Sequence, residues 1–292
     1  MSAAAPDDAG TALARPTHIR RRRRITLPAV LLVIASLLVV LPGLFVLFTA
    51  FKTQAGYTVD KIGFPSPITF DNIETAMRGG RFALWLTNSI ILAAGSVLLS
   101  LAVSVPTAFA FARMRFPGQT ILLSVVTALI VLPPVVLVLP LFLFLTRAGL
   151  TSSHVGAIIV YAGLLTPFSV YLLTSFFRAI PTALIDAASI DGAPNHLVLV
   201  RIILPLSAPA IATLIIVNAL WVWNDLLIAL VLLPRDELKT LMVGVTVFGS
   251  RYNSDVPVAM MGMLIASLPM LLLYLVGQRW FIRGLAAGGL KG

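Results

Sequence analysis

Residues 178–206 read RAIPTALIDAASIDGAPNHLVLVRIILPL, a segment with charged and turn residues between two long apolar blocks. Pro181 is expected to end the preceding helix, and residues 183–190 are compatible with a short helix. Gly192 ends this short helix, because glycine tolerates the left-handed conformation of a helix cap. Pro194 fits the first turn of a second short helix. The sequence therefore predicts a helix–turn–helix loop here rather than a flexible linker.

The rest of the chain is a series of apolar blocks. Apolar residues make up 59% of the 292 residues and charged residues 11%, whereas soluble domains hold about 45–50% and about 25%. A membrane-spanning helix needs about 20 mostly apolar residues. Six segments satisfy this requirement: 26–49, 86–112, 120–145, 154–177, 207–233 and 258–278. We therefore expect an all-α polytopic membrane protein with six transmembrane helices, embedded in lipid.

The first apolar block is interpreted as a retained membrane anchor. Arginines precede it, as in a signal peptide, but the apolar part of a signal peptide covers only about 7–15 residues. The five consecutive arginines at 20–24 would also suit a nucleic acid. The simpler interpretation is a topology anchor against anionic lipid, so no nucleic-acid partner is expected.

The distribution of charge predicts the orientation in the membrane. With the N-terminus inside, the inner segments hold thirteen basic and four acidic residues, and the outer segments hold eight basic and six acidic residues. Because basic residues favour the cytoplasmic side, both termini are expected there. The predicted organisation is a basic, partly disordered cytoplasmic tail over 1–25, a transmembrane domain over 26–278 and a cytoplasmic tail over 279–292.

The spacing within residues 178–206 resembles the EAA loop of binding-protein-dependent ABC importers. That pattern is Glu-Ala-Ala, three residues, Gly, nine residues, Ile, one residue, Leu-Pro, and every spacing is met. The matching residues are Asp186, Ala187, Ala188, Gly192, Ile202, Leu204 and Pro205. The one departure is aspartate at position 186, which keeps the charge but shortens the side chain by one methylene. Weaker similarities to the carbohydrate-uptake branch, and within it to the maltose-type second permease, lie at 88–89, 117–118, 223–225 and 284–292.

The resemblance implies the fold of a type I ABC importer permease in a bacterial inner membrane. It also implies that the chain forms a pathway for a sugar, most simply a di- or oligosaccharide, together with a second homologous permease. Two ATPase subunits would hold ATP and Mg, and an extracellular solute-binding protein would deliver the sugar. We call residues 178–206 the coupling loop, since this loop docks on the ATPase in the family. The residues so assigned are Asp186, Ala187, Ala188, Asp191, Gly192, Ala193, Ile202, Leu204 and Pro205.

Two further regions are candidates for contact with the cargo or its carrier. Asp225 is an acid within a predicted span, where a charge costs at least about 2.5–3.5 kcal/mol unless it has a partner or a cavity. On a continuous helix Asn218, Trp221 and Asp225 fall within about 60° of each other, and Asn224 points about 100° from Asp225. These four residues would suit a sugar, although polar contacts between helices are an open alternative. Residues 234–257 correspond in position to the family's segment that probes the binding protein, or form a solvated connection.

Several kinds of active site are missing from the sequence. It has no cysteine, its three histidines are widely separated, and it lacks the G-x-x-x-x-G-K-[ST] pattern of a phosphate-binding loop. We therefore expect no catalytic residue, no metal site and no cofactor in this chain. An ion-coupled secondary transporter remains an alternative, although no span carries the paired ionisable residues of a proton relay. An integral-membrane enzyme is the other alternative, although no catalytic cluster is evident.

Overall fold

The computed structural model describes residues 27–78, 81–251 and 255–289. These residues form helices, turns and loops, and none of them lies in a β-strand. The chain divides into two compact units, residues 1–44 and 45–292, and each is described by itself. The predicted tail over 1–25, with its five arginines, falls outside the described residues.

The first unit holds most of helix α1 (Leu27–Ala50), whose last six residues belong to the second unit. The helix has 24 residues and carries no acidic residue in its first turn and no basic residue in its last. At 1.5 Å per residue it is about 36 Å long, enough to cross a hydrocarbon core of about 30 Å. This helix covers residues 27–49 of the predicted span 26–49, whose first residue lies outside the described residues.

Three long helices of the second unit match predicted spans. They are α4 (Arg81–Arg113), α7 (His154–Ala179) and α14 (Val256–Gly289), and each is long and apolar enough to cross a membrane. Two short helices precede them in the segment after α1, namely α2 (Gln54–Val59) and α3 (Asp71–Met77). Helix α14 continues beyond residue 278, where the predicted span ends, as far as Gly289.

The third predicted span, residues 120–145, is not one continuous helix. Helix α5 (Gln119–Leu129) and helix α6 (Pro134–Arg147) meet at an angle of 101°. Pro133 and Pro134 explain the break, because proline lacks an N–H donor and excludes the helical conformation from the residue before it. Pro134 then occupies the first turn of α6, where the missing donor costs nothing.

The fifth predicted span, residues 207–233, is also interrupted. Helix α11 (Ala208–Asn224) ends before Asp225, and a short helix α12 (Leu227–Leu232) follows. At its other end α11 meets the helical segment 195–206 at 75°. After α12 come a 3₁₀ turn (Asp236–Leu238) and helix α13 (Leu241–Arg251).

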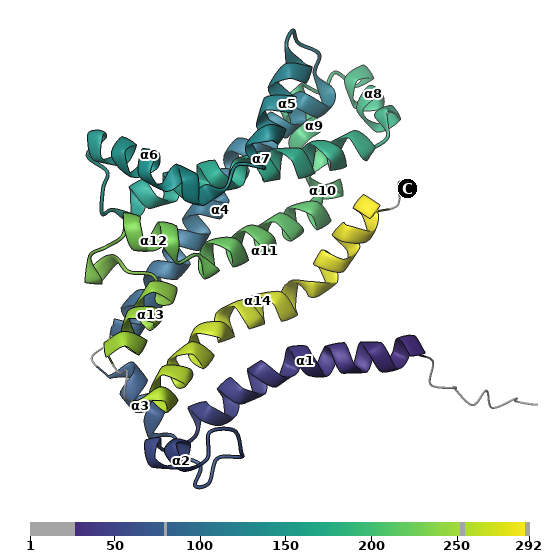
Figure 1. The fold of residues 1–292 in the computed structure, drawn as a ribbon. Coiled ribbons are helices and arrows are strands. Elements are labelled where there is room, and N and C mark those ends of the chain that lie inside the picture. The colour runs from purple at the N-terminus through teal and green to yellow at the C-terminus, as the bar shows by residue number, and fades with distance from the viewer. Residues whose placement is uncertain (1–26, 79–80, 252–254, 290–292) are drawn as a thin grey trace, which may run out of the picture. The chain divides into compact units, whose positions relative to one another are not determined.

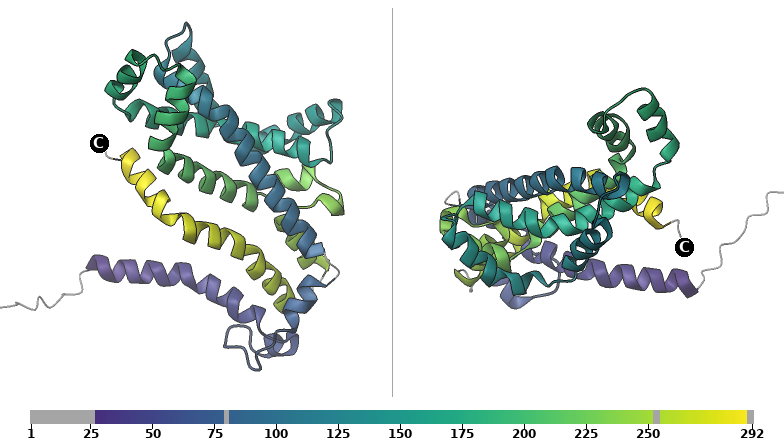
Figure 2. Two further views of the ribbon diagram at one scale, coloured as in Figure 1. Left: turned by 180° about the vertical axis from the view of Figure 1, so that it is seen from behind. Right: turned by 90° about the horizontal axis from the view of Figure 1, so that it is seen from above.

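Helices α4 and α7 pack against each other and run in the same direction (Figures 1 and 2). A Cβ atom added at Gly95 would lie 2.6 Å from Ile158, so the helices approach closely at this glycine. Further along, Ser100 lies 3.5 Å from the hydroxyls of Thr166 and Ser169. Small residues allow the close backbone approach that drives helix packing in lipid, where the hydrophobic effect between helices is weak.

Candidate functional site

The first half of the coupling loop is a short helix closed by glycine, as predicted. Helix α8 (Thr182–Ile190) begins after Pro181, which takes the N-cap position. Gly192 has φ +76°. The N–H groups of Gly192 and Ala193 donate to the carbonyls of Ser189 (3.1 Å) and Ala188 (2.9 Å). This is the Schellman arrangement, which pairs the free carbonyls at a helix end and requires a left-handed residue.

The second half of the coupling loop is an irregular helix. Helix α9 (Asn195–Val198) passes through a π-helical turn (Leu199–Ile203) into α10 (Leu204–Leu206). Pro194 is the N-cap of α9, one position before the predicted first turn. Val198 and Ile203 are buried in a core cluster that includes Phe109 of α4 and Phe177 of α7. This half of the loop is therefore fixed to the spans.

The family-like residues of the coupling loop lie on two faces. Ala188, Ala193 and Ile202 pack against the core cluster that holds Phe177, and Leu204 is partly buried. Asp186, Ala187, Asp191, Gly192 and Pro205 are exposed. Two apolar side chains of α8 share this exposure, since Leu184 is 46% exposed and Ile190 is 87% exposed. Exposed apolar side chains with polar residues around them suit a surface that docks on a partner.

The segment that follows α12 is tied to the start of α4. The Trp85 indole N–H donates to the carbonyl of Asp236 at 3.2 Å, and the Asn88 amide donates to those of Glu237 (2.8 Å) and Lys239 (3.0 Å). Ser89 accepts from the N–H of Leu241 at 2.8 Å. These contacts cover the first part of the predicted outer segment 234–257, so that part is held in place rather than loose.

Asp225 marks the break between α11 and α12. Its Oδ2 atom accepts from the Tyr161 hydroxyl at 2.6 Å and from the N–H groups of Ile228 (3.0 Å) and Ala229 (3.1 Å). The carboxylate thus satisfies two of the free N–H donors in the first turn of α12, as an N-cap side chain does. The predicted stripe of Asn218, Trp221 and Asp225 required one continuous helix. This assumption is wrong, because α11 ends one residue before Asp225.

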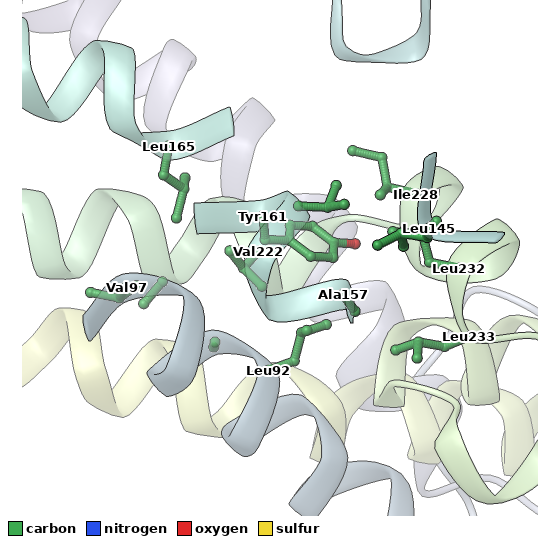
Figure 3. Packing of buried hydrophobic residues seen from close by; sticks show 13 residues of the cluster. Leu92, Val97, Leu145, Ala157, Tyr161, Leu165, Val222, Ile228, Leu232 and Leu233 are labelled. Atoms are coloured by element: carbon green, nitrogen blue, oxygen red, sulfur yellow. The ribbon is translucent and has the colours of Figure 1, made fainter. Parts of the chain in front are cut away.

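Tyr161, the partner of Asp225, lies in the middle of a buried cluster drawn from α4, α6, α7, α11 and α12 (Figure 3). Its side chain is fully buried, and its ring contacts Trp221 edge-on at 6.0 Å between centroids. Tyr161 is not among the site residues predicted from the sequence. A buried tyrosine needs a partner for its hydroxyl, but a partner 64 residues away in the chain leaves no local pattern.

The other three candidates for the pathway occupy different environments. Asn218 is buried and donates to Ser169 on α7 at 3.0 Å, so it connects two helices. Asn224 is exposed, and its amide donates to the carbonyl of Leu220 in its own helix at 2.8 Å. Trp221 is 37% exposed.

The four candidate residues line two cavities. The first, of about 430 Å³, lies where the bend between α5 and α6 faces α7 and α11, and is lined by Asn218 and Trp221 among apolar side chains. The second, of about 580 Å³, is lined by Trp221, Asn224 and Asp225 together with Tyr274 of α14. Trp221 therefore contributes to both cavities.

This helical membrane architecture has counterparts among known proteins. The family model of "Binding-protein-dependent transport system inner membrane component" matches residues 102–285. The chain belongs to this family, and is thus a multi-pass inner-membrane component of a transport system.

Individual relatives match along nearly the whole chain. SmoH, the sulfoquinovosyl glycerol transport system permease protein of Agrobacterium fabrum, is 34% identical over 262 residues, which is 88% of this chain and 92% of that protein. SugB, the trehalose transport system permease protein of Mycobacterium tuberculosis, is 32% identical over 272 residues, or 92% and 99%. A chain of a bacterial ABC transporter that imports the acidic polysaccharide alginate has the same fold. It is 24% identical with a TM-score of 0.76, covering 87% of this chain and 95% of that chain.

Proposed function

We propose that this chain is the permease subunit of an ATP-driven importer for a di- or oligosaccharide or a related glycoside. The names of two relatives support the class of cargo, since SmoH transports a glycosyl glycerol and SugB a disaccharide. The chain does no chemistry of its own in this proposal. ATP hydrolysis takes place on two separate ATPase subunits, which hold ATP and Mg.

The observation that carries the proposal is the geometry of the coupling loop. The left-handed Gly192 turns the chain between α8 and the irregular helix 195–206. One face of this loop packs on α4 and α7, and the other exposes Asp186, Leu184 and Ile190. A segment that is fixed to the spans and exposed beyond them is suited to transmit the closure of an ATPase to the membrane helices.

The remaining parts of the proposal concern the assembly. A second, homologous permease pairs with this chain to enclose the pathway, and an extracellular binding protein delivers the sugar to the side that holds residues 234–257. Both termini lie in the cytoplasm of a bacterial cell, which the charge asymmetry of the loops supports. The ordered contacts between residues 236–241 and α4 support a rigid outer platform for the binding protein.

Purification of the tagged chain from its native host tests this proposal. We expect an ATPase and a second permease to copurify, and the complex in proteoliposomes to take up a labelled sugar only with ATP inside and a loaded binding protein outside. The opposite result is a chain that purifies alone and takes up sugar in response to an ion gradient. That result would favour a secondary transporter and overturn the proposal.

A further inference from the structure

Two arginines at the end of the spans cross over to cap each other's helices. The Arg113 side chain, at the end of α4, donates from Nη2 to the carbonyls of Phe177 and Ile180 at the end of α7. The Arg178 side chain, at the end of α7, donates from Nη2 to the carbonyl of Phe111 in α4 at 3.2 Å. We propose that Arg113 and Arg178 form a reciprocal clasp that positions the coupling helix α8. This rests on the proposed function of the coupling loop.

The direction of the two helices makes such a clasp favourable. Because α4 and α7 run the same way, their C-terminal ends lie together. Each end leaves up to four carbonyls without an intrahelical partner and carries a partial negative charge. An arginine satisfies both needs at once, since it brings N–H donors and a positive charge. Each arginine caps the other helix rather than its own, so the pair also connects the two spans.

The clasp acts on the coupling helix through its point of attachment. Ile180, whose carbonyl Arg113 binds, directly precedes Pro181, the N-cap of α8. On the other side of the junction, Ile185 of α8 packs in the same core cluster as Phe177. The start of α8 is therefore held by polar contacts and by packing at neighbouring points, so movement of α8 is passed to α4 and α7 together.

A further contact and a shared cavity place the docking surface at the same junction. The Gln119 amide, at the start of α5, donates to the Phe111 carbonyl at 2.8 Å, so this acceptor receives two donors. A cavity of about 360 Å³ is lined by Arg113, Arg178, Gln119 and Asp186. Asp186 is the first residue of the EAA-like pattern in the coupling loop, so the clasp lies beside the acid that is expected to face the ATPase.

The test combines a distance measurement with a transport measurement in the assembled complex. Spin labels are attached to Val103→Cys on α4 and Ser189→Cys on α8, both exposed positions. The chain has no cysteine of its own, so only these two positions are labelled once the cysteines of the partner subunits are replaced. The variants are Arg113→Gln, Arg113→Lys and Arg178→Gln. Arg115→Gln is the matched control, because Arg115 is exposed and shows no hydrogen bond or ion pair among the described residues.

We expect one narrow distance between the labels in the parent and in the Arg115→Gln control, with and without ATP. Arg113→Gln and Arg178→Gln should broaden it and lower the number of sugar molecules imported per ATP by about threefold or more. Arg113→Lys should give a distance distribution and a ratio of sugar to ATP between those of the parent and of Arg113→Gln. The reason is that an ammonium keeps the charge but does not reproduce the planar fork of arginine. If Arg113→Gln fails to assemble, Arg113→Lys still allows both measurements.

An unchanged distance distribution and an unchanged ratio of sugar to ATP in the arginine variants would overturn the clasp. So would an equal loss in the Arg115→Gln control, which would point to surface charge alone. Failure of the parent complex to import any sugar would instead contradict the proposed function, and the distance distributions would still decide whether the clasp holds α8.

Discussion

Single residues of the loop and of the α11 break have roles that depend on backbone conformation rather than on side-chain chemistry alone. Gly192 was assigned from sequence because only glycine adopts a left-handed cap without strain, and its φ of +76° agrees. The role of Asp225 could not be assigned in this way. Its partner Tyr161 is distant in sequence, and only the folded chain brings the two side chains within 2.6 Å.

Gly192→Ala should strain the coupling loop without a steric clash. A Cβ at this position meets no atom within 4 Å, so the cost is the left-handed backbone alone, about 1–2 kcal/mol. We expect the variant to lower ATPase stimulation by the loaded binding protein. Gly149→Ala is the control, because Gly149 also has positive φ (+68°) and open space but lies outside the coupling loop. Equal loss of stimulation in both variants would remove the special role of Gly192.

Tyr161→Phe should weaken the junction between α11 and α12. The variant removes a hydrogen bond to a carboxylate, and such bonds contribute about 1.5–3 kcal/mol. A lower midpoint of thermal unfolding of the purified complex is expected, and in an Asp225→Asn background the same change should cost less. Tyr171→Phe provides the comparison, as Tyr171 is 46% exposed. Additive effects of the Tyr161 and Asp225 changes would show that the two residues are not coupled.

Among the elements, the long helices could be predicted from sequence and the broken ones could not. Apolar length alone gives α1, α4, α7 and α14. The same criterion joined α5 to α6 across Pro133, because proline is tolerated within membrane helices and does not by itself signal a bend of 101°. The break at Asp225 was also missed, because long apolar stretches flank Asn224 and Asp225 and no glycine or proline stands there.

Helix α13 should be sensitive to a methyl group at its first turn. A Cβ added at Gly244 would lie 2.1 Å from the Trp85 ring, which itself donates to the Asp236 carbonyl. Gly244→Ala should therefore displace Trp85 and destabilise the fold by about 1–3 kcal/mol, measured by thermal unfolding. Gly262→Ala in α14 is the control, because a Cβ there meets no atom within 4 Å. If Gly244→Ala is as stable as this control, the close packing of α13 on Trp85 is wrong.

At the scale of the whole molecule, the fold class followed from composition, whereas the orientation in the membrane is still a prediction. Few water-soluble folds could bury a chain with 59% apolar residues in blocks of about 20, so the composition indicates a membrane protein. Orientation depends on a difference in loop charge of a few residues, which acts during insertion and leaves no mark on the packing.

Labelling of single cysteines in whole cells and in inverted vesicles should establish the orientation. Ser189→Cys on α8 and Ser66→Cys in the segment after α1 are both exposed, and the parent chain has no cysteine. A membrane-impermeant maleimide should reach Ser66→Cys in whole cells and Ser189→Cys only in inverted vesicles. The reverse pattern would place the coupling loop outside the cell and contradict both the orientation and the ATPase contact.

Helix α4 is held at both of its ends, by Trp85, Asn88 and Ser89 at one and by Arg113 at the other. Insertion or deletion of one residue between them would turn one set of contacts by 100° against the other and shift it by 1.5 Å. The number of residues between the two sets of contacts in α4 is therefore constrained. Homologous chains should vary in the loops that flank this helix and keep the number of residues from its first anchor to its last.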